Sequence, residues 1–257
     1  MSSSDLQNPP DELEARHQTL VGHLAELRTR LMIAGYFIIA GMIVCYNYTD
    51  LMFDIIRKPI APYLPSGGLV FTGPADKFIA HLKMAFFGGL VLACPFWVYQ
   101  IWKFVAPGLY SKEKKYTLSF IFFGTILFIT GVLFAYFLVF PAAFHFLMGF
   151  GGNVDTPMIT IEQYLSFFVT TSLMFGLSFE LPLIISILGM LGLVSSKFLR
   201  EKRRFAVVVL AIIAAIITPP DLLSMMMMLV PMLFLYEIGV WVVFFSEKKR
   251  KENESNF

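Results

Sequence analysis

Long apolar runs separated by short charged segments constrain this chain more than any other feature. Six such runs occur, at residues 31–48, 78–101, 118–140, 164–193, 205–217 and 222–245. A helix needs about 20 apolar residues to cross a bilayer core of about 30 Å. In lipid, only helices and closed barrels pair all of their backbone polar groups. The runs therefore predict an all-α polytopic membrane protein with six transmembrane helices.

The last two of these helices are predicted to be short. Run 205–217 would be about 20 Å long as a helix, well below the thickness of the bilayer core. Pro219 and Pro220 follow it, and Pro231 interrupts the sixth run. The pair could cross a locally thinned bilayer or form a re-entrant hairpin. In either case the chain returns to the side that it left.

Basic residues are distributed very unequally between the two sides of this membrane domain. Arg57, Lys58 and Lys77 lie in the loops of one side. Sixteen of the twenty Lys and Arg residues lie in the tails and loops of the other side: Arg16, Arg28, Arg30, Lys103, Lys112, Lys114, Lys115, Lys197, Arg200, Lys202, Arg203, Arg204, Lys248, Lys249, Arg250 and Lys251. Because basic loops stay in the cytoplasm, both termini are predicted to be cytoplasmic. The expected organisation is a polar cytoplasmic tail at 1–18, the membrane domain at 19–246 and a charged cytoplasmic tail at 247–257.

The sequence lacks the usual signatures of catalysis. It has no Gly-Lys-Ser/Thr phosphate loop, no His-Glu-x-x-His motif and no Gly-x-Ser-x-Gly motif. Its four histidines are scattered, and Cys45 and Cys94 both lie in apolar runs. A net charge of +2 is too small to indicate nucleic-acid binding. We therefore expect a binding protein that is not an enzyme and has no catalytic residue, cofactor, metal site or nucleic-acid partner.

Five short motifs occupy distinctive positions along the chain. His-Leu-Ala-Glu-Leu-Arg at 23–28 precedes the first run, and Ala-Pro-Gly-Leu-Tyr-Ser-Lys-Glu at 106–113 follows the second. Phe-Gly-Leu-Ser-Phe-Glu-Leu-Pro at 175–182 lies inside the fourth run. Thr-Pro-Pro-Asp at 218–221 joins the last two runs, and Tyr-Glu-Ile-Gly at 236–239 lies in the sixth. In this order and on these sides, the motifs closely resemble TatC, the multi-spanning core subunit of the twin-arginine protein translocase.

The resemblance implies roles for particular residues. Glu26 and Glu113 match the two cytoplasmic carboxylates that receive the paired arginines of a signal peptide, and Arg28 and Phe104 match neighbouring positions. The implied function is a receptor and scaffold that exports folded proteins across the bacterial cytoplasmic (inner) membrane, driven by the proton-motive force. The implied partners are twin-arginine signal peptides, TatA, often TatB, and further copies of the chain in a multi-subunit complex within the lipid bilayer.

The chemistry of arginine agrees with these two carboxylates. A guanidinium forms two parallel hydrogen bonds with a carboxylate, which an ammonium cannot copy. Two local alternatives remain open. Glu26 could pair with Arg30 at i,i+4, worth about 0.2–0.5 kcal/mol. Glu113 could form a weak surface ion pair with a neighbouring lysine.

Two acidic residues lie within apolar runs. A carboxyl at the depth of Glu180 costs about 2.5–3.5 kcal/mol on insertion scales, which indicates a functional role. Pro182 is expected to kink the helix beside it, and a local hydrogen bond from Ser178 is the structural alternative. Glu237, in the sixth run, is a weaker case of the same kind. A proton-coupled small-solute transporter that uses Glu180 is the alternative function, with an intramembrane hydrolase as a third.

Two residues on the outer side complete the candidates. The first outer loop, 49–77, is long and rich in Pro and Gly, which predicts an ordered cap on the outer face. Pro59 lies in this loop, and we expect it to be structural. Asp221 precedes the sixth run, where it is expected to cap the helix N-terminus or to contact substrate.

Overall fold

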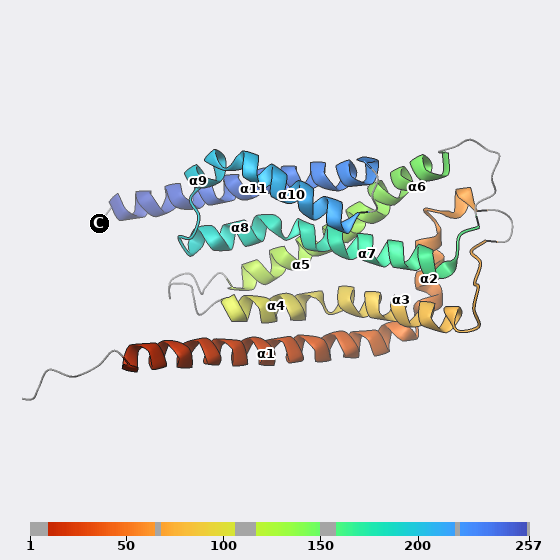
Figure 1. Cartoon of the computed structure of the whole chain (residues 1–257), viewed down its shortest axis with the longest axis horizontal. Helices are drawn as coiled ribbons and strands as arrows, with labels where there is room; N and C mark the ends of the chain where they lie inside the picture. The colour runs from red at the N-terminus through yellow and green to blue at the C-terminus, as the bar shows by residue number, and fades with distance from the viewer. Residues whose placement is uncertain (1–9, 65–67, 106–116, 150–157, 219–221, 256–257) are drawn as a thin grey trace, which may run out of the picture.

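The computed structural model describes residues 10–64, 68–105, 117–149, 158–218 and 222–255. Within these residues the chain is almost entirely helical and contains no strand, and one isolated parallel bridge joins Val70 to Thr160. The helices are α1 (Pro10–Tyr46), α2 (Thr49–Arg57), α3 (Asp76–Leu92), α4 (Cys94–Val105), α5 (Thr117–Phe134), α6 (Phe140–Gly149), α7 (Ile161–Phe179), α8 (Leu181–Met190), α9 (Ser196–Glu201), α10 (Arg203–Ile217) and α11 (Leu222–Ser255). Most of them run along the long axis of the molecule (Figure 1).

The lengths of the helices fit a membrane protein. Among the described residues, four helical segments are long and apolar enough to cross a membrane: Leu24–Tyr46, Leu118–Gly149, Ile161–Met190 and Met225–Lys248. The bent pair of α3 and α4 is a fifth candidate. Helix α10 has 15 residues, or about 22 Å. The prediction of a polytopic all-α membrane protein is confirmed, whereas the count of six crossings stays a prediction.

Two predicted spans are broken next to prolines. The run at 78–101, expected as one span, divides into α3 and α4, which are bent by 58°. Pro95 lies in the first turn of α4, where its ring has no N–H and would clash with an earlier carbonyl in a straight helix. The fourth run is interrupted at Glu180, between α7 and α8, because Pro182 follows, but Ile161–Met190 remains one helical segment without a bend like that of α3 and α4.

Two other helices are longer than the sequence predicts. The third run continues past residue 140, because α5 passes through a π-helical turn at Ala135–Val139 into α6. Helix α11, expected to be short, includes Pro231 without ending there. Proline is tolerated inside membrane helices where neighbouring groups satisfy the freed carbonyl. Of the last two helices, only α10 is therefore short.

Glycines allow the closest contacts between helices. A Cβ added to Gly89 on α3 would lie 2.4 Å from the backbone nitrogen of Met42 on α1. A Cβ added to Gly131 on α5 would lie 2.5 Å from the carbonyl oxygen of Phe175 on α7. Both contacts involve backbone atoms, which cannot move aside as a side chain can. Small residues have this role in membrane helix packing in general.

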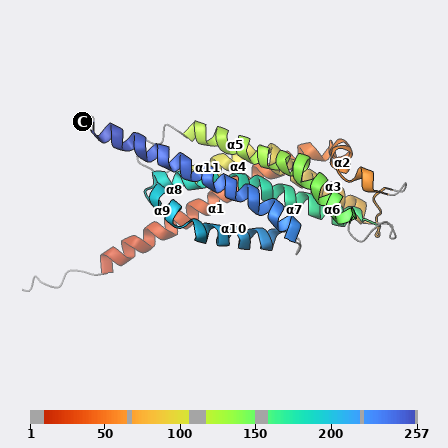
Figure 2. The same ribbon diagram turned by 90° about the horizontal axis from the view of Figure 1, so that it is seen from above.

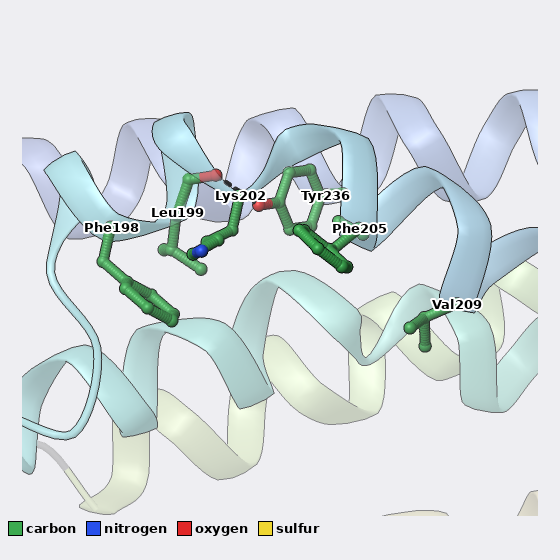
Figure 3. A pocket seen from close by; sticks show the side chains of 7 residues that line it. Phe198, Leu199, Lys202, Phe205, Val209 and Tyr236 are labelled. Carbon is green, nitrogen blue, oxygen red and sulfur yellow. Dashed lines mark hydrogen bonds between the residues drawn. The ribbon is translucent and has the colours of Figure 1, made fainter.

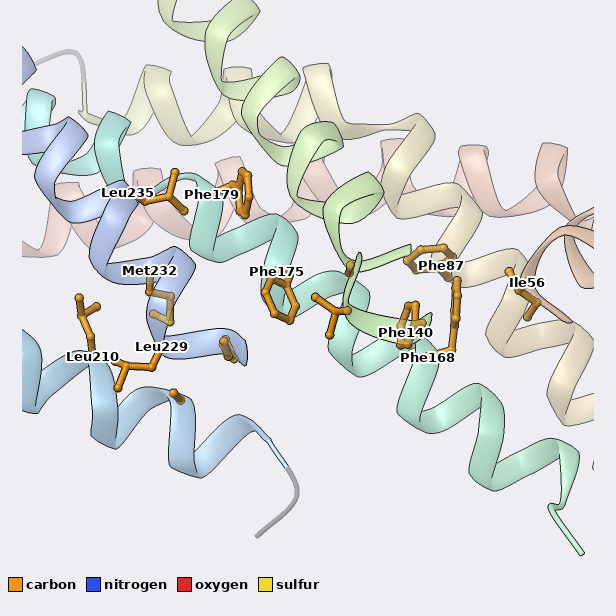
Figure 4. Packing of buried hydrophobic residues seen from close by; sticks show 14 of the residues in the cluster. Ile56, Phe87, Phe140, Phe168, Phe175, Phe179, Leu210, Leu229, Met232 and Leu235 are labelled. Atoms are coloured by element: carbon orange, nitrogen blue, oxygen red, sulfur yellow. The ribbon is translucent and has the colours of Figure 1, made fainter. Parts of the chain in front are cut away.

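A single apolar cluster connects the outer end of the molecule to its last helices (Figure 4). It extends from Ile56 on α2 through Phe87, Phe140 and Phe168 to Phe175 on α7. From there it continues into α10 and α11, through Leu210, Leu229, Met232 and Leu235. Seen at right angles to the first view, α10 lies at the edge of the bundle, and it packs mainly along α11 (Figure 2).

The described part of the first outer loop, 49–77, forms an ordered cap, as the sequence predicts, and its location on the outer face stays a prediction. Helix α2 lies in this loop, and the hydroxyls of Tyr136 and Tyr164 donate hydrogen bonds to the carbonyls of Ile55 and Ile56 at its end. Further along the loop, the backbone of Val70 pairs with that of the residues flanking Thr160 before α7. These hydrogen bonds therefore hold the cap against the membrane helices.

The glycine contact between α1 and α3 makes a testable prediction. Gly89→Ala should lower the free energy of unfolding by about 1–3 kcal/mol, because the two backbones must separate. Gly35→Ala is the matched control, since nothing lies within 4 Å of a Cβ at that position on α1. Thermal unfolding of the two purified variants in detergent measures the difference. Equal melting temperatures would contradict the proposed contact.

Candidate functional site

Glu26 lies near the beginning of the apolar segment of α1, with its side chain 30% exposed. Its Oε1 accepts a hydrogen bond from the Arg30 guanidinium at 2.8 Å. This is the i,i+4 pair that the sequence left open, and it is present. Among the described residues, no hydrogen bond to the second oxygen of Glu26 is found, so the carboxylate keeps acceptor capacity for a second cation.

Arg28 is exposed and lies on a different face of α1. Residues two apart on a helix do not face each other, so Arg28 is directed away from both Glu26 and Arg30. Within the described part of the chain, Arg28 forms no ion pair. It adds positive charge to this end of the helix without neutralising Glu26.

Phe104 is half-buried in the last turn of α4. Helices α1 and α4 pack side by side, and the end of α4 lies beside the first half of α1 (Figure 1). The segment that follows α4, residues 106–116, lies outside the described residues, and Glu113 lies in it. The structure thus brings the helix that carries Glu26 next to the helix that leads to Glu113.

Glu180 is the C-cap residue of α7 and also precedes α8, and the residue is 8% exposed. Its Oε1 is buried without a hydrogen-bond partner in the described part of the chain. The Ser178 hydroxyl donates to the carbonyl of Met174 at 2.7 Å, so the local alternative for Glu180 is wrong.

The space beside Glu180 exists because residue 124 is a glycine. A Cβ on Gly124 of α5 would lie 3.4 Å from Glu180 Oε2, and Val98 of α4 and Leu183 of α8 lie against the same point. The hydroxyl of the next residue, Thr125, is also buried here. Four helices therefore enclose a carboxyl group that retains unused hydrogen-bonding capacity.

Glu237 has a different environment. Its Oε2 lies 2.7 Å from the Arg203 guanidinium, and the pair joins α11 to α10. The neighbouring Tyr236 hydroxyl donates to the carbonyl of Leu199 in α9 at 2.7 Å. Glu237 is thus a half-exposed structural counter-ion, and not an unpaired intramembrane acid like Glu180.

The two outer-side candidates have separate outcomes. Pro59 is half-buried between α2 and the short 3₁₀ turn Ala61–Tyr63, next to the fully buried Ile60. That position fits the structural role expected for it. Asp221 lies outside the described residues, so its role as a cap or a contact stays a prediction.

One ion pair between α3 and α7 was not predicted from the sequence. Lys83 on α3 lies 3.2 Å from the carboxylate of Glu162 and 3.1 Å from the hydroxyl of Ser166, both on α7. The available signal was a lysine inside an apolar run, because such residues are almost always paired. Its partner is 79 residues away, and only the tertiary structure identifies it. Across the described residues, no group of His, Cys, Asp and Glu side chains could hold a metal ion.

The pair of Arg203 and Glu237 makes a prediction about stability. Arg203→Met or Glu237→Met leaves a charge unpaired near the membrane, and each should lower the free energy of unfolding by about 1–3 kcal/mol. The double variant should lose less than the sum of the two, because neither charge is left alone. Thermal unfolding of the four proteins measures this coupling, and additive losses would show that the pair contributes nothing.

Comparisons with known proteins give a consistent result. The family model for Sec-independent protein translocase protein (TatC) matches residues 22–231. The TatC protein of Carboxydothermus hydrogenoformans is 40% identical over 94% of this chain and 99% of its own length. That of Desulforapulum autotrophicum is 37% identical over 90% of this chain and 87% of its own. A crystal structure of the twin-arginine translocase receptor TatC superposes with a TM-score of 0.77 and 32% identity, covering 88% of this chain and 99% of that one.

Proposed function

The chain belongs to the TatC family of Sec-independent protein translocase subunits, and we propose that it binds twin-arginine signal peptides and exports folded proteins. In this proposal it is the receptor and scaffold of the translocase, and the proton-motive force drives transport. The observation that carries the proposal is the half-exposed carboxylate of Glu26, which keeps one oxygen available where α1 enters its apolar segment.

The charges around Glu26 support selection for arginine. Arg28 and Arg30 lie about one helical turn or less from Glu26 on α1, and Lys103 is at the end of the adjacent α4. This basic surface repels cationic peptides in general, so binding needs a specific acceptor. A guanidinium gains two parallel bonds from a carboxylate, and an ammonium does not. Glu113, on the segment that follows α4, supplies the second acceptor for a pair of arginines.

The apolar part of the signal peptide has a surface next to this site. Met32, Tyr36, Ile39 and Ile43 are exposed on α1, and their spacing places them on one face of the helix. That face begins about one and a half turns beyond Glu26. A peptide whose arginines bind Glu26 can therefore lay its apolar segment along α1 within the membrane.

The distribution of basic residues and the length of α10 support the remaining parts of the proposal. The charge asymmetry favours cytoplasmic termini in the bacterial inner membrane and a crossing number of six. A helix of 15 residues is shorter than the bilayer core, which favours local thinning near α10. Small single-span partners, TatA and often TatB, and further copies of this chain would assemble around such a thinned region.

A second candidate function follows from Glu180. Its buried, unpaired Oε1 also suits a proton-coupled small-solute transporter. The two functions differ in what the purified protein does alone. A transporter moves solute in vesicles without partners, whereas a translocase receptor moves none.

Peptide binding tests the receptor proposal. A labelled peptide with two consecutive arginines and an apolar segment should bind the detergent-solubilised protein, and Glu26→Gln should weaken binding about 10–100-fold, as expected for loss of a charged hydrogen bond. The measurement is a fluorescence titration. Arg30→Gln should bind at least as tightly as the original protein, because it frees Glu26 Oε1.

Two controls accompany this titration. Asp54→Asn removes an exposed carboxylate from α2 and should leave the affinity unchanged. A twin-lysine peptide should bind weakly to every variant. Equal binding of the two peptides, unaffected by Glu26→Gln, would contradict the receptor proposal.

The proposed orientation has its own test. In a background with both native cysteines replaced, Phe71→Cys in the outer cap should react with a membrane-impermeant maleimide in intact spheroplasts. Arg250→Cys in the C-terminal tail should react only after the membrane is permeabilised. The reverse pattern would place the termini outside.

A further inference from the structure

An apolar hollow opens at the surface beside the junction of α9 and α10 (Figure 3). Its volume is about 460 Å³, within the range of small-molecule sites. The side chains of Phe198, Leu199, Phe205, Val209 and Tyr236 line it together with Lys202. The hollow lies on different helices from Glu26 and Glu180, so it belongs to neither of the sites described above.

The walls of this hollow offer almost no polar group. The hydroxyl of Tyr236 donates to the carbonyl of Leu199 at 2.7 Å, and this bond satisfies both atoms. The ammonium of Lys202 lies 5.3 Å from the centre of the Phe205 ring. In the described part of the chain, no carboxylate is within ion-pair distance of Lys202. The hollow thus combines apolar walls with one cation that has no neutralising partner.

Other basic residues lie close to Lys202 in the sequence, and two of them, Lys197 and Arg203, have acidic partners. Lys197 lies 4.0 Å from Glu201, Arg203 pairs with Glu237, and the Arg200 guanidinium lies over the Phe244 ring at 4.7 Å. Arg204, like Lys202, has no anionic partner among the residues that the structure describes. Because residues two apart on a helix do not face each other, Lys202 is the cation that lines the hollow.

The position of the hollow relative to the bilayer follows from α10. Beyond Arg204 the exposed residues of this helix are apolar, and they include Phe205, Val208, Ile212 and Ile216. Lys202 consequently lies where the polar surface of the chain changes into its lipid-facing surface. From Lys202 to Val209 the hollow extends about 10 Å along the helix axis, in the direction of the hydrocarbon core.

We propose that this hollow binds one acyl chain of an acidic phospholipid, whose phosphate group is held by Lys202. Basic pockets at the cytoplasmic ends of membrane helices recognise acidic lipid head groups in the same way. The lipid matches both features of the site, because a zwitterionic lipid brings no net charge for the cation and a free phosphate brings no chain for the apolar walls. Such a lipid would anchor α10, which is too short to span the bilayer core and packs mainly along α11.

Native mass spectrometry of the full-length protein tests this proposal. The probes are phosphatidylglycerol and phosphatidylcholine with identical acyl chains, added to the protein in nonionic detergent. We expect phosphatidylglycerol to be retained at least tenfold more than phosphatidylcholine. Lys202→Gln should remove that preference, and sodium phosphate should not displace the bound lipid.

Two further variants separate the site from general charge effects. Val209→Trp fills the hollow from an exposed position and should reduce phosphatidylglycerol retention at least fivefold with the charges unchanged. Lys58→Gln/Lys77→Gln removes two charges from the outer side and should retain the lipid fully. Equal retention of the two lipids, or equal losses in the inner and outer charge variants, would overturn the proposal. So would displacement of the lipid by phosphate, or unchanged retention by Val209→Trp.

Discussion

Direct contact between helix backbones at glycines is the interaction on which the rest of the structure depends. In a bilayer, apolar side chains gain nothing by leaving lipid for protein, so helix association relies on close packing. Gly89 lets α3 touch α1 at Met42, and Gly131 lets α5 touch α7 at Phe175. Because α4 continues from α3, the first of these contacts also determines that Glu26 of α1 lies on the helix beside the one that leads to residues 106–116. The packing of the bundle thus determines the place of the proposed receptor site.

Prolines provide the second constraint on the structure, because they interrupt helices. Polar groups lie at these interruptions. Pro182 ends α7 at Glu180, so this carboxyl lies at a helix break between α4, α5 and α8. Pro95 bends α3 and α4 by 58° on the other side of the same region. In straight helices, the backbone N–H and C=O groups at these two positions would be paired within a continuous helix. The interrupted bundle instead holds a carboxyl with an unpaired oxygen in its interior. Burying such a group lowers the stability of the fold.

Local patterns in the sequence predicted local structure well. The apolar runs predicted the fold class, Pro182 predicted the break at Glu180, and the spacing of Glu26 and Arg30 allowed the ion pair that is present. Pairings between distant segments were not predictable from the sequence. Lys83 contacts Glu162, and Arg203 contacts Glu237, only because the tertiary packing of the helices brings them together. The continuation of α11 through Pro231 was missed for a related reason, because the neighbours that make a proline tolerable are tertiary. Glu113 and Asp221 lie outside the described residues, and their roles stay predictions, as does the orientation.

We propose that Glu26 on α1 receives the arginines of a signal peptide. Photocrosslinking of a bound signal peptide is the most direct test of this contact. A photoreactive residue placed next to the arginine pair of a bound signal peptide reports which part of the chain surrounds that pair. We expect crosslinks to α1 close to Glu26 and to the segment between α4 and α5, and their loss when the pair is changed to lysines. Crosslinks concentrated around Glu180 or on the outer cap, or crosslinks that are insensitive to the change to lysine, would contradict it.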